Sequence, residues 1–182
     1  MAMSCSFPAP TDQGRCLNMP SPVTPDVEIY PLLELHMTIK RLDHISVVVD
    51  DLESAIGFFT ALGMSVEGKA RVEGPWVDRI NALEGIQVDI VMMRTPDGHG
   101  RLELTKFLNP ELVELVPAIA PPNALGLRSA MFAVERVDDA VARLQAKGGE
   151  LIGEVVQYED QYRLCYMRGP AGIIVSLAEE LS

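Results

Sequence analysis

The sequence predicts an α+β fold made of two tandem β-α-β-β-β modules. Residues 49–63 and 134–148 are two copies of one pattern, separated by an offset of 85 residues. The copies share their first valine, two alanines and the final glycine, and similar strand patterns follow each copy. The chain of 182 residues has room for one well-filled domain but not for two ordinary ones. A duplicated unit within one domain indicates two halves that share a core and both contribute walls to a cleft.

The first module begins with a strand over residues 41–49, where β-branched residues alternate with small or polar ones. Asp50 and Asp51 then supply a helix N-cap, and apolar residues recur at helical spacing until Gly63 ends the helix. Further along, the pattern predicts a strand over 65–72, a short helical turn over 76–83, and strands over 87–95 and 101–107 that pair through a turn at 96–98.

The second module repeats this order, with a strand over 127–134, a helix over 137–147 that two glycines end, and strands over 151–157, 162–168 and 173–178. We therefore assign the modules to residues 37–108 and 126–181 of one domain, 37–181. The proline-rich residues 109–125 form the connection between them. Residues 1–36 contain six prolines and no periodicity, which predicts a disordered or extended leader.

Charge and cysteine content restrict the classes of function. The chain has 26 acidic and 15 basic residues, a formal net charge of −11, which argues against nucleic-acid and anionic-membrane partners. No apolar run approaches the roughly 20 residues that span a bilayer. The three cysteines are too scattered for a disulfide framework, so we expect a cytoplasmic protein. Cys165 has no histidine near it in the sequence and is interpreted as a buried strand cysteine.

Three segments, together with the paired modules, identify a family resemblance. They are the opening strand Leu42 to Val49, the fourth strand Arg101 to Leu104, and the closing segment Gly169 to Leu177. In this order they resemble the vicinal oxygen chelate superfamily, which includes glyoxalase I, methylmalonyl-CoA epimerase, extradiol dioxygenases and the bleomycin-resistance proteins. The resemblance covers residues 37–181 and implies the glyoxalase/bleomycin-resistance fold, in which the two modules form a curved mixed sheet around a cup. Because this superfamily supports many chemistries, it does not by itself define the reaction.

The resemblance implies a divalent metal in the cup, with ligands from the first and fourth strands of each half. His44 and Glu103 occupy these places in the first half. The offset of 85 residues places Ser129 at the position of His44, and Ser176 corresponds to Glu103 once one residue is allowed for the longer turn at 98–100. Protonated hydroxyls are poor ligands, so only two strong donors remain, and a divalent metal held by His44 and Glu103 with water or substrate would bind weakly. Metal-dependent and metal-free function both stay open. No other cofactor is expected.

Glu103 and His44 are also the candidate catalytic residues. Glu103 lies between two leucines on a strand, so its carboxylate faces away from them, and either Arg101 or Thr105 on the same face is its expected partner. A role in contacting or deprotonating a ligand and a structural ion pair both fit this pattern. For His44, a histidine that is simply hydrogen-bonded within the sheet is the alternative to a metal ligand or acid.

Further residues are expected to line the cup and bind substrate. Strand alternation points to Ser46, Ser129 and Met131, the correspondence with Glu103 points to Ser176, and positions in a loop and in a hairpin point to Trp76 and Tyr166. Core filling explains the methionine equally well, and ordinary packing is the alternative for the tryptophan.

Two functions follow from the resemblance and the retained residues. The first is a lyase or isomerase, similar to lactoylglutathione lyase, that acts on a small carbonyl compound or thiol conjugate; Glu103 is the base, His44 the acid or metal ligand, and the serines bind the developing oxyanion. The second is a metal-free protein of the bleomycin-resistance type that sequesters a small-molecule ligand. The family likeness also implies a homodimer.

Overall fold

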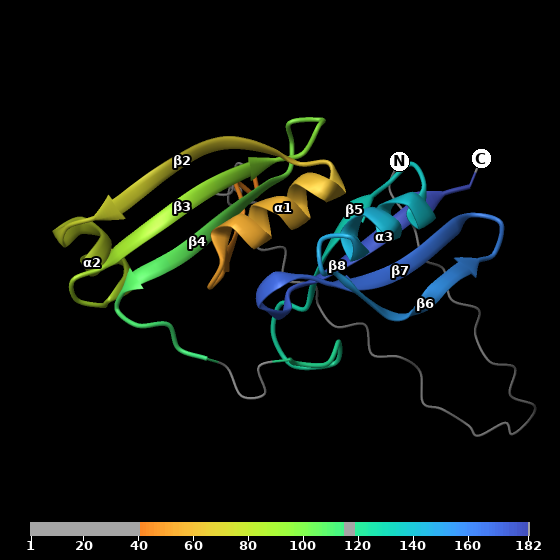
Figure 1. Cartoon of the computed structure of the whole chain (residues 1–182). Helices are drawn as coiled ribbons and strands as arrows, with labels where there is room; N and C mark the ends of the chain where they lie inside the picture. Colours follow the sequence, from red (N-terminus) through yellow and green to blue (C-terminus); the bar gives the residue numbers. More distant parts are fainter. Residues whose placement is uncertain (1–40, 115–118, 182) are drawn as a thin grey trace, which may run out of the picture. The chain divides into compact units, whose positions relative to one another are not determined.

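The computed structural model describes residues 41–114 and 119–181 of the chain. The predicted leader 1–36 lies outside these residues, as does part of the predicted connection. In chain order the elements are β1 (Ile45–Val48), α1 (Leu52–Leu62), β2 (Ser65–Glu73), α2 (Pro75–Asn81), β3 (Gln87–Arg94), β4 (Arg101–Asn109), β5 (Ser129–Ala133), α3 (Val137–Gln145), β6 (Glu150–Tyr158), β7 (Tyr162–Arg168), the 3-10 turn η1 (Pro170–Gly172) and β8 (Ile174–Glu180) (Figure 1). This order confirms the predicted pair of β-α-β-β-β modules.

Each module forms its own four-stranded mixed sheet. The strand orders are β1-β4-β3-β2 and β5-β8-β7-β6, so the first and last strands of a module are neighbours. In both sheets this pair is parallel and the other two pairs are antiparallel. The predicted mixed sheet is therefore divided between the modules, and the long strands β2, β3 and β4 curve visibly along their length (Figure 1).

Local chemistry explains where helix α1 begins and ends. The Asp51 carboxylate accepts a hydrogen bond of 3.0 Å from the backbone nitrogen of Ser54, as an N-cap residue does. Gly63 follows the helix with φ +114°, in the left-handed region that glycine enters without strain. Of the two predicted caps, Asp51 is the one that bonds. Helix α3 has no side-chain cap of its own; instead Glu179 of β8 accepts a hydrogen bond of 2.8 Å from the nitrogen of Val137.

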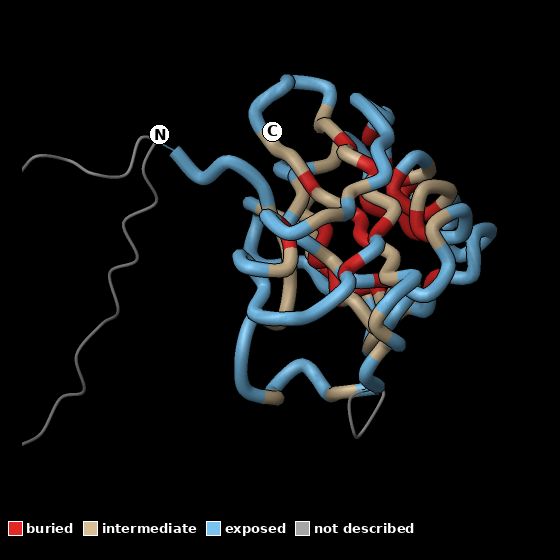
Figure 2. The backbone as a smooth tube through the Cα atoms, turned by 90° about the vertical axis from the view of Figure 1, so that its left-hand side faces the viewer, coloured by how far each residue is buried: buried red, intermediate tan, exposed pale blue. Residues whose placement is uncertain are grey.

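The two modules share one hydrophobic core. Helix α1 contacts α3, and each helix packs on its own sheet. The core combines residues from both modules, and Figure 2 shows the buried positions gathered in the interior of the fold. Its largest fully buried side chains include Phe58, Phe59, Met93, Leu144 and Met167. Phe58 reaches from the first module to two glycines of the second: a Cβ added at Gly169 would lie 2.7 Å from its ring, and one added at Gly149 would lie 3.0 Å away.

The modules differ mainly between their second and third strands. In the first module this connection contains α2, whereas a short turn joins β6 to β7 in the second. For this reason Glu103 and Ser176 are 73 residues apart rather than 85, and the allowance of one residue made from the sequence was wrong. The longer turn at 98–100 accounts for one residue of the difference and the connection for most of the rest. Strand β1 is shorter than predicted, because residues 41–44 lie outside the ladder.

Candidate functional site

The first sheet has one face against the core and one open face. On β4, Leu102 and Leu104 are buried in the core, so Glu103 between them points to the opposite side. Ser46 is the register partner of Glu103 on β1, and His44 directly precedes that strand. The structure thus brings together three residues that the sequence predicted for the site.

Hydrogen bonds hold the Glu103 carboxylate in one orientation. Its Oε1 atom accepts a hydrogen bond from the hydroxyl of Ser46 and another from the hydroxyl of Thr105, each 2.9 Å long. Its Oε2 atom lies 3.9 Å from Nε2 of His44. The Glu103 side chain is 21% exposed and that of His44 is 35% exposed. One carboxylate oxygen is therefore fixed by the sheet, while the other faces the imidazole in a place that a small molecule can reach.

Asp43 orients His44 and was not predicted. Its Oδ2 atom lies 3.1 Å from Nδ1 of His44, and because a carboxylate only accepts, Nδ1 is the donor. The Nε2 atom is then the one that faces Glu103. The hydrogen bond from His44, followed by those from Arg41, holds the pKa of Asp43 below its usual value. The only signal for this contact in the sequence was that Asp43 and His44 are adjacent. The structure shows that the backbone before β1 brings the two side chains together.

Arg101 is not the partner of Glu103. The sequence allowed either Arg101 or Thr105, and the structure uses Thr105. Arg101 instead donates to Oε1 of Glu67 at 2.5 Å, and Arg94 donates to the same oxygen. The hydrogen bond from Arg101 lowers the pKa of Glu67, and Glu67 in turn raises the pKa of Arg101. A β-bulge between Val66 and Gly68 accompanies this contact, and no sequence signal predicted it.

The opposite end of the open face is apolar. Val77, Ile86 and Val88 form a small buried cluster there, with Val72, Ile90 and Phe107 packed against it. Helix α2 therefore covers this end of the sheet. Trp76 lies on α2 with 58% of its surface exposed, and among the described residues no hydrogen bond or ion pair joins it to Glu103.

The other predicted residues meet on the second sheet. Ser176 is the register partner of Met131 on β5 and of Tyr166 on β7, so the three side chains share one face. Together with Val156 and neighbouring residues they line a shallow hollow of about 190 Å³. Ser129 lies two residues before Met131 on β5 and so shares its face. Ser176 is buried, whereas Met131 and Tyr166 are exposed.

The register of the strands shows that the two open faces are equivalent. Ser46 pairs with Glu103 in the first sheet as Met131 pairs with Ser176 in the second. This supports the sequence correspondence of Glu103 with Ser176. Each predicted group occupies its own sheet, and no described hydrogen bond or ion pair joins the two groups within residues 41–114 and 119–181.

The donor set does not fit a resident divalent metal. Within the described part of the chain, no three His, Cys, Asp or Glu side chains converge as metal ligands. At the predicted position only His44 and Glu103 are strong donors, and Oε1 of Glu103 already accepts two hydroxyl hydrogen bonds.

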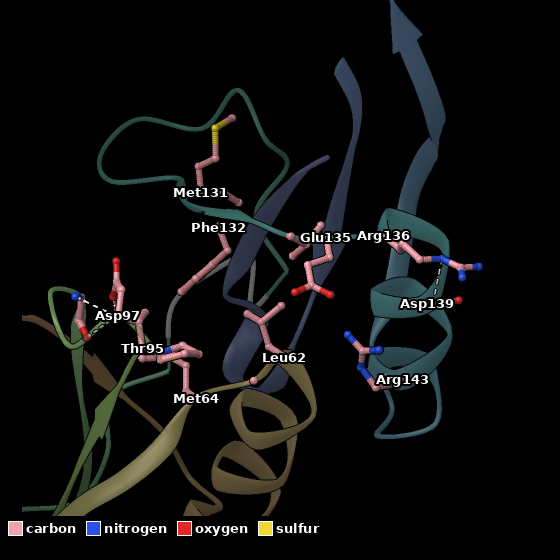
Figure 3. Close-up of a pocket in the computed structure, with 15 residues that line it drawn as sticks. Leu62, Met64, Thr95, Asp97, Met131, Phe132, Glu135, Arg136, Asp139 and Arg143 are labelled. Carbon is pink, nitrogen blue, oxygen red and sulfur yellow. Dashed lines mark hydrogen bonds and ion pairs between the residues drawn. The ribbon is translucent and has the colours of Figure 1, made fainter. Parts of the chain in front are cut away.

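A larger cavity of about 580 Å³ lies elsewhere, between the turn that joins β3 to β4 and the start of α3 (Figure 3). Its charged groups are largely satisfied by their own neighbours. Arg136 pairs with Asp139 at 3.1 Å, Arg143 donates to the carbonyl oxygen of Ala61 at 3.0 Å, and Asp97 accepts from the hydroxyl of Thr95 at 2.5 Å. Neither His44 nor Glu103 lines it, so it is distinct from the site on the first sheet, but it shares Met131 with the hollow on the second sheet.

Comparison with known proteins identifies the class to which this fold and site belong. Residues 41–177 match the family model of the Glyoxalase/Bleomycin resistance protein/Dioxygenase superfamily. The chain belongs to this superfamily, as the resemblance of its motifs implied.

Solved structures agree with this assignment. A glyoxalase family protein from Bacillus cereus is 51% identical, with 79% of this chain and 96% of that chain covered and a TM-score of 0.76. A glyoxalase family protein from Enterococcus faecalis, 20% identical over 78% of this chain and 98% of its own, has a TM-score of 0.52. The trypanothione-dependent glyoxalase I of Leishmania major is 21% identical over 78% of this chain and 88% of its own, with a TM-score of 0.54. The latter two share the fold alone.

A comparison with curated proteins found no match. Within the described residues, no helix combines the length and the apolar character that crossing a bilayer requires.

Proposed function

We propose that the protein is a glyoxalase-like lyase or isomerase, which moves a proton on a small carbonyl compound or thiol conjugate bound to the open face of the first sheet. The observation that carries this proposal is the orientation of the Glu103 carboxylate. Two hydroxyls fix its Oε1 atom, while Oε2 is left facing Nε2 of His44 at 3.9 Å. A carboxylate oriented in this way, beside a second group that exchanges protons, suits general acid–base catalysis.

The proposed step uses Glu103 as base and His44 as acid. Oε2 of Glu103 takes a proton from the carbon next to the substrate carbonyl, and the electron pair of that C–H bond moves toward the carbonyl oxygen. Protonated His44 donates from Nε2 to this oxygen, because its Nδ1 proton is directed to Asp43. In a substrate with a hydroxyl on the carbon that lost its proton, as in a hemithioacetal, this hydroxyl then gives its proton to Nε2 of His44 as a new carbonyl forms there. Glu103 returns its proton to the former carbonyl carbon, so both side chains end as they began and atoms and charge balance over the cycle.

We propose that this step proceeds without a resident metal. The support is the donor set described above, which supplies two strong ligands where a stable site needs three or four. The test is to expose purified protein to Ni, Zn, Mn and Fe and to measure bound metal per chain, with Glu103→Gln as comparison. Stoichiometric metal that is lost in this variant would contradict the proposal.

A second candidate is a metal-free binding protein of the bleomycin-resistance type. The observation in its favour is that the second sheet has hydroxyl and thioether groups where the first has an acid and a base: Ser129, Met131 and Ser176 line a face next to Tyr166. Such a face binds a ligand without reacting with it.

Deuterium exchange separates the two candidates. The protein is incubated in D2O with small ketones and with glutathione hemithioacetals of small aldehydes, and NMR follows both exchange of the C–H next to the carbonyl and formation of a thioester. Glu103→Gln is expected to lower the exchange rate about a hundredfold or more while leaving the fold intact. Glu53→Gln is the matched control, because Glu53 is 83% exposed on α1. Binding of these probes without any exchange would favour the sequestering protein.

We further propose a homodimer in the cytoplasm. The open faces expose large apolar side chains, including Val48, Met131, Val156 and Tyr166, which a second copy of the chain would cover. The cytoplasmic location rests on cysteine usage. Sedimentation that shows only monomer at micromolar concentration would contradict the dimer, and cell fractionation tests the location.

A further inference from the structure

We infer that the substrate of the Glu103 site is a carboxylate-bearing carbonyl compound, and that Arg94 and Arg101 bind its carboxylate. This inference rests on the proposed function, because it takes Glu103 to face the reacting carbon. The inference adds to the proposed function a subsite for the substrate carboxylate and an orientation of the substrate on the sheet.

The two arginines lie beside Glu103 on the same open face. Arg94 of β3 and Arg101 of β4 are register partners, and Arg101 is two residues before Glu103 on its strand. Two residues of extended strand span roughly 7 Å. The Arg101 guanidinium lies 3.9 Å from Asp43, which contacts His44, and His44 in turn faces Glu103 at 3.9 Å, so Arg101 borders the residues around the Glu103 carboxylate.

The guanidinium groups have donors to spare. Each carries five N–H donors in a planar fork that matches a carboxylate. One donor of each is directed to Oε1 of Glu67. A second nitrogen of Arg101 lies 3.9 Å from Asp43, beyond hydrogen-bond length. The Arg94 side chain is 41% exposed and that of Arg101 is 27% exposed, so their remaining N–H groups include some that a ligand can reach.

Charge is distributed along the face in a way that favours an anionic ligand with an apolar tail. Two guanidinium groups share the single carboxylate of Glu67, whereas Asp43 is held by Arg41 and His44. At the other end, Ile90 and Phe107 pack on a buried apolar cluster. The substrate carboxylate therefore lies at the arginines, its carbonyl at Glu103 and His44, and its apolar part toward Phe107.

The experiment compares two probes that differ in one group. NMR titration of the full-length protein measures the dissociation constants of 2-oxo-4-phenylbutanoate and of 4-phenyl-2-butanone, in which a methyl group replaces the carboxylate. We expect the acid to bind about tenfold more tightly or better in low salt, since hydrogen bonds to charged groups are the strong ones. Arg94→Gln and Arg101→Gln should remove most of this preference and leave ketone binding unchanged.

Two further variants separate ligand binding from a structural role. Glu67→Gln removes the carboxylate that competes with the ligand and should tighten binding of the acid several-fold. If the ion pairs of Glu67 with the two arginines only stabilised the sheet, this variant would not improve binding. Arg71→Gln is the matched control, because Arg71 pairs with Asp89 at 2.8 and 3.0 Å in the same sheet and is distant from Glu103 in register. Circular dichroism verifies that each variant is folded.

Equal affinity for acid and ketone, or equal loss of both in the arginine variants, would overturn the inference. Its failure is distinguishable from failure of the proposed function. Deuterium exchange on the ketone that depends on Glu103, without any preference for the acid, would leave the catalytic proposal standing alone. Preference for the acid that depends on the arginines, without exchange, would support the subsite and contradict the lyase or isomerase.

Discussion

Replacing Gly169 by alanine should destabilise the protein by about 1–3 kcal/mol, the usual range for overpacking a filled core. The added Cβ would lie 2.7, 2.9 and 3.1 Å from three ring carbons of Phe58, whereas carbon atoms in contact are normally about 3.5–4.0 Å apart. The backbone at Gly169, with φ −113° and ψ −167°, is accessible to alanine, so the cost is steric rather than conformational. The ring is fully buried and has little room to move.

The assay is urea unfolding followed by circular dichroism, with thermal unfolding alongside. For a domain of this size, each kcal/mol corresponds to roughly 3 °C in Tm, so a decrease of about 3–9 °C is expected. Gly68→Ala is the matched control, because a Cβ there meets nothing within 4 Å. In a Phe58→Leu background the Gly169→Ala cost should shrink, since the colliding atoms are gone. If Gly169→Ala were as stable as Gly68→Ala, the close packing of Phe58 against the second module would be refuted.

Three further perturbations test other parts of the structure. Asp51→Ala should cost about 1 kcal/mol in the same urea assay, because the Ser54 nitrogen loses its cap; an unchanged midpoint would contradict this role. The Arg163 hydrogen bonds lower the pKa of Asp138, so the stability they contribute is present above the unfolded pKa and lost as pH falls through the folded one. Asp138→Asn should therefore lower the urea midpoint at pH 7 but not at about pH 2, and a difference that persists in acid would contradict the ion pair. Burial raises the pKa of the Cys165 thiol, so with the two N-terminal cysteines replaced by serine, iodoacetamide should label the native protein far more slowly than the urea-unfolded chain; equal rates would exclude a buried thiol.

The fold could be predicted from the sequence because the repeated pattern contains the cap and turn residues that define where its elements end. Asp51 and Gly63 define the ends of α1, and a turn residue pattern at 96–98 correctly predicted the pairing of β3 with β4. The offset between the copies then placed the second module on the same plan. Cys165 was also correctly predicted to be buried.

Contacts between strands were harder to predict than the strands themselves. The proximity of His44 and Glu103 was expected from the resemblance, and Thr105 was one of the two partners that strand alternation allowed for Glu103. The attachment of Arg101 to Glu67 did not, because 34 residues separate them and their meeting depends on strand register and a bulge. The shortening of β1 was likewise missed, since residues 41–44 bond to one another and to the open face instead of extending the ladder.

The boundary between the modules is packed more tightly on one side than on the other, because Phe58 lies on only one of them. Under the 85-residue offset, Phe58 corresponds to Arg143 and Gly149 to Met64. A ring inserted between glycines occupies one side, while Arg143 and Met64 border the cavity of about 580 Å³ on the other. On the side where Phe58 packs against the glycines there is no room for one extra methyl group, whereas the equivalent side borders a cavity. Larger side chains are therefore tolerated on only one side of the boundary between the modules.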